Sequence, residues 1–289
     1  MCRLLGIAAS ERTNFHFSLH TAPRSLASLS VEHPHGWGVG VYDADHGWTL
    51  RKRPVRASEC EQFYEAATST YGELLVAHVR ARTVGEASAV NTHPFRRERW
   101  LFAHNGTITN TAYLRARTSP ERLRQIEGQT DSELFFSYLL TCFDQAGVSA
   151  EPASPHTDRV LGSALREALA QPSFGACNFL LSDGDVLYGH RHGRTLFVLE
   201  RHPPDRVRVH RESHETGAAI DTPWTPDRHA VLIASEEMTA EPWTEVAEGT
   251  LLRCERYLAG AFKRGSEVWP VFSARSLLES PPSLQAAAS

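Results

Sequence analysis

The second residue of the chain is a cysteine, and the first strand expected from the sequence begins almost directly after it. Residues 4–9 are apolar or small, which is typical of a short buried strand. A small residue after Met1 allows the initiator methionine to be removed, which would give Cys2 both a thiol and a free α-amino group. An α-amine titrating near neutral pH can take up the thiol proton, so Cys2 would be a nucleophile that carries its own base.

Length and charge set the frame for the rest of the chain. The 289 residues are 41% hydrophobic, which is enough to bury a sizeable core. The net charge of −4 gives no electrostatic footprint for nucleic acid. No shift in composition marks a boundary, so we expect one domain over residues 2–275 and a disordered tail over residues 276–289.

Cysteine usage and hydropathy predict a cytoplasmic protein. The five cysteines are widely spaced, odd in number and without a Cys-x-x-Cys motif, so we expect free thiols in a reducing compartment. No apolar run approaches the roughly 20 residues of a membrane span, and the N-terminus lacks a signal-peptide pattern. We therefore expect no membrane partner. The cysteines are Cys2, Cys60, Cys142, Cys177 and Cys254.

The order of the expected elements favours two packed sheets with helices outside them. A capping-box pattern at Ser58 and Glu61 predicts a helix to about residue 69, and a second one at residues 130–133 predicts another. A helix over about 158–170 follows, and the second half of the chain is rich in expected strands. Strands, then helices, then strands predict an α+β fold. The strands expected in the first half cover residues 36–43, 47–53, 73–80 and 100–104.

Three polar groups lie where chemistry is often found, at strand ends and helix starts. Arg80 ends an apolar strand and could clamp a carboxylate, although a surface ion pair would explain it equally. Asn105 and Gly106 form the strongest two-residue turn signal, but an amide and a backbone N–H are also what an oxyanion requires. Asp131, in the first turn of a helix, serves either as a helix cap or as a partner for a substrate ammonium group.

Several motifs in a fixed order resemble the glutaminase domain of the class II, N-terminal-nucleophile glutamine amidotransferases. The resemblance spans about residues 2–256, because the late segments 234–236 (Ala-Ser-Glu), 241–243 (Glu-Pro-Trp) and 248–251 (Glu-Gly-Thr-Leu) are also similar to the family's C-terminal strands. The N-terminal Met-Cys-Arg-Leu-Leu-Gly and the Asn-Thr-His-Pro-Phe segment are most similar to the stand-alone branch, which includes γ-glutamyl hydrolases of ergothioneine biosynthesis and of glutathione breakdown. The motifs are Cys2 and residues 36–38 (Gly-Trp-Gly), 78–80 (His-Val-Arg), 91–95 (Asn-Thr-His-Pro-Phe), 103–106 (Ala-His-Asn-Gly) and 130–133 (Thr-Asp-Ser-Glu).

The resemblance implies a four-layer αββα sandwich of two antiparallel sheets flanked by helices. It implies that Cys2 is the nucleophile and, through its α-amine, the general base. Asn105 and the N–H of Gly106 would then form the oxyanion hole. We expect neither a metal nor a cofactor.

The resemblance also implies how substrate is held. Arg80 would bind the α-carboxylate of a γ-glutamyl group and Asp131 its α-ammonium, while Thr83 and His93 would line the same pocket. A pocket that carries opposite charges at fixed separation rejects amides without the amino-acid head, because its own charges would stay unpaired. Many relatives have Asp where this chain has His35, which changes the charge near the expected site.

The leading hypothesis is an amidohydrolase that cleaves glutamine or another γ-glutamyl amide through a Cys2 thioester. Two alternatives stay open. One is a glutaminase subunit that supplies ammonia to a separate synthase, because the sequence after residue 256 is too short for a second active site. The other is a γ-glutamyl-binding module without catalysis, which would follow if Met1 were retained.

A metal-dependent hydrolase is disfavoured. Two histidine pairs, His33 with His35 and His190 with His192, have ligand-like spacing, but the chain has no His-Glu-x-x-His motif and no cysteine-rich spacing. Ordinary turn or surface histidines explain both pairs better.

Overall fold

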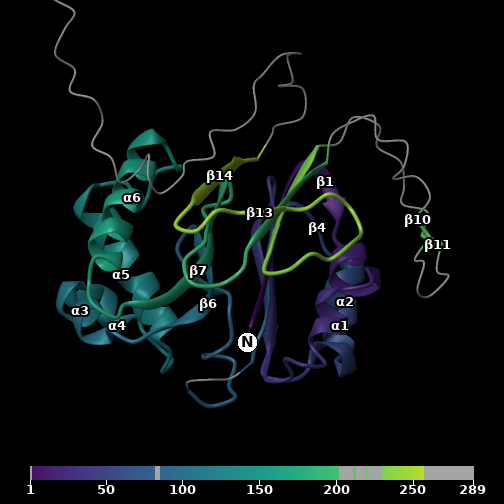
Figure 1. Cartoon of the computed structure of the whole chain (residues 1–289), viewed down its shortest axis with the longest axis horizontal. Helices are drawn as coiled ribbons and strands as arrows, with labels where there is room; N and C mark the ends of the chain where they lie inside the picture. The colour runs from purple at the N-terminus through teal and green to yellow at the C-terminus, as the bar shows by residue number, and fades with distance from the viewer. Residues whose placement is uncertain (1, 82–84, 202–210, 213–218, 221–228, 257–289) are drawn as a thin grey trace, which may run out of the picture.

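Two antiparallel sheets form the centre of the protein, which we describe from a computed structural model (Figure 1). The structure describes residues 2–81, 85–201, 211–212, 219–220 and 229–256. The expected tail over residues 276–289 lies outside these residues, as does the end of the expected domain from 257 to 275.

The larger sheet has seven strands in the order β13-β9-β12-β1-β4-β2-β3, with every neighbouring pair antiparallel. The first strand of the chain is therefore central, between β12 and β4. The strands are β1 (Arg3–Asn14), β2 (Trp37–Asp43), β3 (Gly47–Arg53), β4 (Tyr71–Val79), β9 (Phe197–Arg201), β12 (Ala230–Ala234) and β13 (Thr244–Glu245).

The second sheet has five antiparallel strands in the order β14-β8-β7-β6-β5. Two short strands pair with each other apart from both sheets, β10 (Arg211–Glu212) and β11 (Ala219–Ile220). The strands of the five-stranded sheet are β5 (Phe95–Arg97), β6 (Trp100–Ile108), β7 (Gly175–Ser182), β8 (Val186–His190) and β14 (Leu251–Glu255).

Helices cover the two outer faces, one group on each sheet, as Figure 1 shows. The group beside the seven-stranded sheet consists of η1 (Phe17–Thr21), α1 (Leu26–Leu29), η2 (Ala57–Glu59) and α2 (Glu61–Ser69). The group beside the five-stranded sheet consists of α3 (Thr111–Arg117), α4 (Pro120–Arg124), α5 (Asp131–Gln145) and α6 (Pro155–Leu169). The layers are thus helix, sheet, sheet and helix, which confirms the predicted αββα sandwich.

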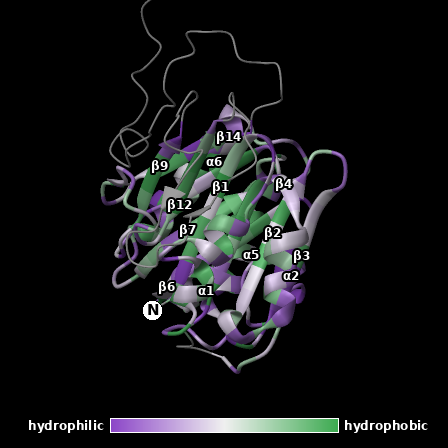
Figure 2. Ribbon diagram, turned by 90° about the vertical axis from the view of Figure 1, so that its right-hand side faces the viewer, coloured by the Kyte–Doolittle hydropathy of each residue, from purple (hydrophilic) through white to green (hydrophobic). Residues whose placement is uncertain are grey.

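Alternation along the strands produces three separate apolar layers. Many of the strands are hydrophobic, as the green ribbons in Figure 2 show. Leu4 packs between the two sheets, with Val76 of β4 and Leu180 of β7. Its neighbour Leu5 points to the opposite face and packs under the helices of the seven-stranded sheet with Phe63. The same sheet therefore buries both of its faces, and β1 is apolar on both sides.

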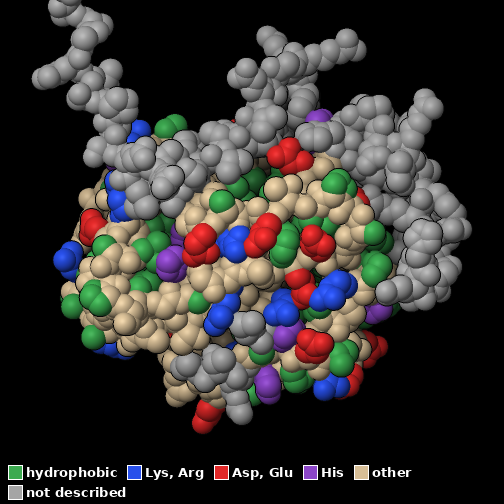
Figure 3. All heavy atoms as spheres, viewed as in Figure 1, with side chains coloured by type: hydrophobic (Ala, Val, Ile, Leu, Met, Phe, Trp, Pro, Cys, Tyr) green, Lys and Arg blue, Asp and Glu red, His purple; other side chains and the backbone are tan. Residues whose placement is uncertain are grey.

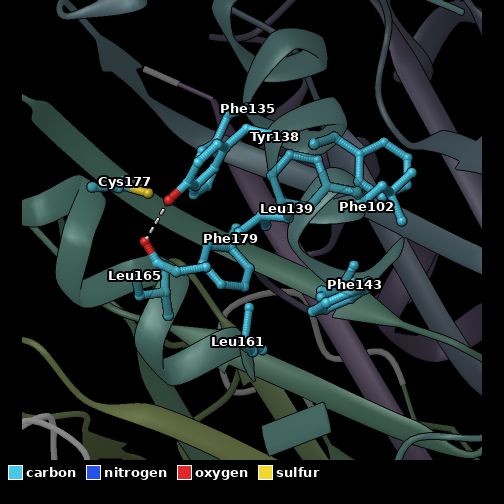
Figure 4. Close-up of a cluster of buried hydrophobic side chains, with 14 of the residues drawn as sticks. Phe102, Phe135, Tyr138, Leu139, Phe143, Leu161, Leu165, Cys177 and Phe179 are labelled. Atoms are coloured by element: carbon cyan, nitrogen blue, oxygen red, sulfur yellow. Dashed lines mark hydrogen bonds between the residues drawn. The ribbon is translucent and has the colours of Figure 1, made fainter. Parts of the chain in front are cut away.

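The largest apolar layer lies between the five-stranded sheet and α5 with α6 (Figure 4). Phe102 of β6 stacks on Phe136, with the ring centroids 5.1 Å apart and the planes 5° apart. The Tyr138 hydroxyl, buried in this layer, donates a hydrogen bond to the Ala164 carbonyl oxygen at 3.1 Å. The layer fixes α5 against β6, and with it the first turn of α5 that carries Asp131.

Several boundaries differ from the sequence prediction. The expected capping box at Ser58 is wrong, because residues 57–59 form a short 3-10 helix and α2 starts at Glu61 without a side-chain cap. The Ser58 N–H instead bonds to the Ser30 hydroxyl oxygen at 2.9 Å. Strand β6 continues through Asn105 and Gly106 instead of ending at residue 104. Tertiary pairing with β7 extends the strand across what is locally a turn signal.

In the Gly-Trp-Gly motif at the start of β2, Trp37 and Gly38 face opposite sides of the seven-stranded sheet. Trp37 lies under the outer helices, edge-on to Phe63 with centroids 5.2 Å apart. Gly38 faces the segment that contains His93, and a Cβ atom there would lie 2.0 Å from the His93 carbonyl oxygen and 2.8 Å from Pro94 Cδ. Only glycine allows this close approach of two backbones.

We predict that Gly38→Ala destabilises the fold by about 1–3 kcal/mol, because the added methyl group collides with backbone that cannot rotate away. The measurement is the free energy of unfolding in urea. Gly6→Ala is the matched control, since its Cβ would meet only side-chain ends of Leu180 and Leu187 at 3.0–3.2 Å. Equal losses in the two variants would contradict this explanation.

Candidate active site

Cys2 lies directly before β1 and is half-buried. Its Sγ atom is 3.4 Å from both the N–H and the carbonyl oxygen of Ala81, accepting from the first and donating to the second. Burial raises the pKa of the Cys2 thiol, while the Ala81 N–H and the charge of Arg80 act in the opposite direction. The thiol is thus held in a fixed place with its proton favoured.

The carbonyl end of Cys2 is held by an ion-pair cluster. The Arg3 guanidinium donates from Nη1 to the Cys2 carbonyl oxygen at 3.2 Å and from Nε to the carboxylate of Glu236. The same carboxylate accepts from Arg24. Glu236 has no role predicted from the sequence, because no local pattern indicates that it meets residues more than 200 positions earlier.

Arg80 follows β4, whose last residue Val79 pairs with Arg3, and its charge acts on the Cys2 thiol. Its side chain is buried, at 3% exposure, and Nη1 donates to the Glu86 carbonyl oxygen at 3.0 Å. The Arg80 backbone bonds to Gly36, with its N–H 2.8 Å from that carbonyl oxygen. A buried cation therefore lies beside the thiol at the end of the seven-stranded sheet.

Asn105 and Gly106 approach the same region from the five-stranded sheet. Asn105 Nδ2 donates to the Ser235 hydroxyl oxygen at 3.3 Å, and that oxygen also accepts the N–H of Leu4 at 2.9 Å. The Ser235 hydroxyl group thus lies between the Asn105 amide and β1, the strand that follows Cys2. Gly106 is packed tightly, since a Cβ there would lie 2.0 Å from the Ala176 carbonyl oxygen.

Asp131 is the first residue of α5 and contacts Ile108, the last residue of β6. One of its carboxylate oxygens accepts the N–H of Ile108 at 2.6 Å. The preceding Thr130 caps the helix, accepting the Glu133 N–H at 3.2 Å. Burial lowers the pKa of His104, two residues before Gly106, while the Asp131 carboxylate acts in the opposite direction. The carboxylate is therefore close to the Asn-Gly segment.

His93 lies in the packed interior and Thr83 lies outside the described residues. The His93 ring is 4.4 Å from that of His78 and 4.6 Å from that of Phe95, centroid to centroid. Burial and the neighbouring His78 keep the pKa of His93 well below its usual value, so it is neutral. That these two residues line a substrate pocket stays a prediction.

The second histidine pair considered as metal ligands, His190 with His192, has other partners. His190 Nδ1 is 3.0 Å from the Thr250 carbonyl oxygen, and His192 Nδ1 is 3.1 Å from the Glu248 carboxylate. Across the ranges that the structure describes, no group of three or more His, Cys, Asp or Glu side chains is placed to hold a metal ion. The same residues include no helix long and apolar enough to cross a membrane.

The half-buried thiol of Cys2 thus has the charge of buried Arg80 close to it, and Ser235 joins the Asn105 amide to the strand that follows Cys2. The Asp131 carboxylate lies at the end of β6, the strand that carries Asn105. The family model of the class II glutamine amidotransferases matches residues 1–268. The chain belongs to this family. The match covers every described residue from Cys2 to Arg256, so the sequence resemblance is confirmed.

The chain is similar to proteins of Methanocaldococcus jannaschii and Saccharomyces cerevisiae. The protein MJ1515 of Methanocaldococcus jannaschii is 30% identical over 282 residues, a match that covers 93% of this chain and 71% of that protein. A Saccharomyces cerevisiae protein named "Probable glutamine amidotransferase DUG3" is 26% identical over 264 residues, covering 76% of this chain and 69% of that protein.

Solved structures share the fold. A structure described as a predicted glutamine amidotransferase from Pseudomonas aeruginosa superposes with a TM-score of 0.60 and 25% identity, covering 87% of this chain and 96% of that chain. Glutamine phosphoribosylpyrophosphate amidotransferase from B. subtilis superposes with a TM-score of 0.55 over 88% of this chain and 47% of its own. At 16% identity the second comparison supports the αββα fold alone.

The charges on the face seen in Figure 3 are mixed, with acidic and basic side chains interspersed. Many charged side chains of the described residues are paired, as between Arg191 and Glu245 at 2.8 Å and between Arg201 and Glu241 at 2.6 Å. A face of this kind gives no broad attraction for a polyanion, in line with the low net charge.

We predict that His33 makes the fold sensitive to acid. Burial, aided by the charge of Arg3, lowers the pKa of His33 to about 4, whereas an unfolded histidine titrates near 6.5. Between these values the unfolded chain binds the proton and the folded one does not, so stability falls as the pH is lowered from about 6.5 to about 4. His33→Asn should make the free energy of unfolding depend less steeply on pH, by up to one proton. Urea unfolding at pH 7, 6, 5 and 4.5 measures this slope, and an unchanged slope would contradict the role of His33.

Proposed function

We propose that the protein cleaves the γ-amide of glutamine or of another γ-glutamyl compound through a thioester on Cys2. Membership of the class II glutamine amidotransferases supports hydrolysis of the glutamine amide in general. One observation carries the proposal: the Ser235 hydroxyl oxygen accepts hydrogen bonds from both the Asn105 amide and the Leu4 N–H, two residues after Cys2. Buried Arg80 adds a positive charge that acts on the thiol.

The first half of the proposed reaction forms the thioester. Once Met1 is removed, the α-amine of Cys2 takes the thiol proton, and Sγ attacks the γ-carbonyl carbon. The carbonyl oxygen becomes an oxyanion that receives hydrogen bonds from Asn105 Nδ2 and the Gly106 N–H. The tetrahedral intermediate then collapses as the α-ammonium returns the proton to the leaving nitrogen, which departs as ammonia or an amine.

The second half releases glutamate. The free α-amine takes a proton from a water molecule, which attacks the thioester carbon. The same oxyanion donors stabilise the second intermediate, and its collapse breaks the carbon–sulfur bond and regenerates the thiol. The burial that raises the thiol pKa makes a local base necessary, because few thiolates would exist otherwise.

Substrate recognition would depend on two charges. Arg80 would hold the α-carboxylate and Asp131 the α-ammonium of the γ-glutamyl group, with Thr83 and His93 shaping the pocket. Both proposed charges project from rigid positions, since the Arg80 backbone is bonded to Gly36 and one Asp131 oxygen is bonded to the Ile108 N–H. Charged groups that are already in place distinguish substrates well, because no energy is spent on moving their side chains when the substrate binds.

A second candidate is a glutaminase subunit that passes ammonia to a separate synthase. The match to the B. subtilis phosphoribosylpyrophosphate amidotransferase covers only 47% of that chain, so this fold occurs there within a larger protein. Glutaminase activity that rises when a separate acceptor protein is added would favour this candidate. A constant activity would favour the hydrolase.

We predict that the chain with a free Cys2 amine releases glutamate and ammonia from L-glutamine, and that Cys2→Ala does not. A chain extended by a short tag before Met1 has the same thiol but an amide in place of the amine, so it should lose most of its turnover. Removal of the tag up to Cys2 should restore it. Full activity of the tagged chain would overturn the role of the amine, and binding of glutamine without release would favour the non-catalytic alternative.

We predict that Asn105→Ala lowers kcat by about 10²–10³ and leaves KM within a few-fold, because the donor acts on charge that develops only in the transition state. Steady-state glutamate release measures both constants. Asn14→Ala is the matched control: Asn14 lies at the far end of β1, where Nδ2 donates to the carbonyl oxygens of Ala67 and Thr70. A near-normal kcat for Asn105→Ala would exclude Asn105 as an oxyanion donor.

A further inference from the structure

Ser235 directly follows β12 and lies between the two strands that carry the proposed catalytic groups. Its hydroxyl oxygen accepts the Leu4 N–H at 2.9 Å and a side-chain N–H of Asn105 at 3.3 Å. The side chain is only 3% exposed. One buried oxygen therefore joins the first strand of the seven-stranded sheet to a side chain of the five-stranded sheet.

Ser235 is itself held from two sides. Its N–H donates to the Leu4 carbonyl oxygen at 3.1 Å, which extends the ladder between β12 and β1 by one residue. Its carbonyl oxygen accepts the Thr195 hydroxyl at 2.9 Å. With both backbone groups bonded, the hydroxyl oxygen has little freedom to move relative to Leu4.

Thr195 is supported in turn by Asn178, which is fully buried and lies opposite Asn105 in the pairing of β6 with β7. Asn178 Nδ2 donates to the carbonyl oxygens of Arg194 and Thr195, each at 3.1 Å. Its Oδ1 accepts the N–H groups of His192 and Arg194 at 2.8 and 3.2 Å. The contacts thus form a closed ring that starts and ends at Asn105.

We propose that Ser235 is a positioning residue that orients the Asn105 amide toward the oxyanion, an inference that rests on the proposed function of Asn105. An amide nitrogen has two N–H groups, so one can bond to Ser235 while the other faces the substrate. The terminal torsion of asparagine is broad and roughly two-fold. Without Ser235 the amide can turn, and its oxygen would then face the oxyanion and repel it.

The test compares Ser235→Ala with Ser235→Thr, which keeps the hydroxyl. Ser235→Ala should lower kcat about 10- to 100-fold with KM changed less than about three-fold, as expected for a misplaced catalytic group. Ser235→Thr should recover most of kcat. The matched control is Ser182→Ala, which removes an equally buried hydroxyl whose oxygen accepts the Gly184 N–H at 3.2 Å, at the far end of β7.

Ligand affinity separates positioning from general damage to the fold. The Cys2 thiol adds to the carbonyl carbon of an aldehyde analogue of glutamine. The product is a tetrahedral adduct whose oxygen occupies the oxyanion position. Ser235→Ala should weaken this aldehyde by about the same factor as kcat and leave glutamate binding unchanged. If Ser235→Ala does not fold, Thr195→Val should show the same pattern, with a smaller loss.

Different results would overturn the proposed function and the role of Ser235. If the wild-type protein releases no glutamate, the proposed function is wrong. If the wild-type protein is active and Asn105→Ala is impaired while Ser235→Ala has normal kcat and normal aldehyde affinity, only the role of Ser235 is overturned. Equal weakening of aldehyde and glutamate would also overturn it, because that pattern indicates a general distortion of the site.

Discussion

The pairing of β1 with both β4 and β12 is the interaction on which the rest of the structure depends. Chain termini usually fray, and a thiol on a frayed end could not be aligned with a substrate. Here the first strand is central in a seven-stranded sheet, and it is apolar on both faces because apolar layers cover each side. The ladder to β4 brings Cys2 next to Arg80, and the ladder to β12 brings Leu4 next to Ser235.

A second constraint is electrostatic. Burial makes the thiol of Cys2 a weaker acid, and the nearby imidazoles of His78 and His93 are neutral because burial lowers both of their pKa values. The proposed base must therefore be close to the sulfur and must titrate near neutral pH. A free α-amine on the same residue satisfies both conditions without any further side chain. The buried His78 and His93 therefore contribute to packing, and neither is placed in the proposed reaction as a base.

The sequence was sufficient to predict the layer architecture and the family, because the motif order and the strand–helix–strand pattern are local properties of the chain. It could not predict that Asn105 and Gly106 lie inside a strand, since the pairing of β6 with β7 overrides a local turn signal. It also missed Ser235 and Glu236 as contacts of the N-terminal residues. Those contacts join positions more than 200 residues apart, and a single sequence carries no signal for them.

The central place of β1 also sets an order of events during biosynthesis. Its last residue paired with β12 is Ala9, whose partner is Ala230. At typical ribosomal speeds of about 5–20 residues per second, the 221 residues from Ser10 to Ala230 take roughly 10–45 s to be made. During that interval the β12 side of β1 has no partner and the N-terminus is not yet enclosed. Removal of Met1 by an aminopeptidase fits into this interval, so maturation of Cys2, the proposed nucleophile, would precede completion of the sheet that begins beside it.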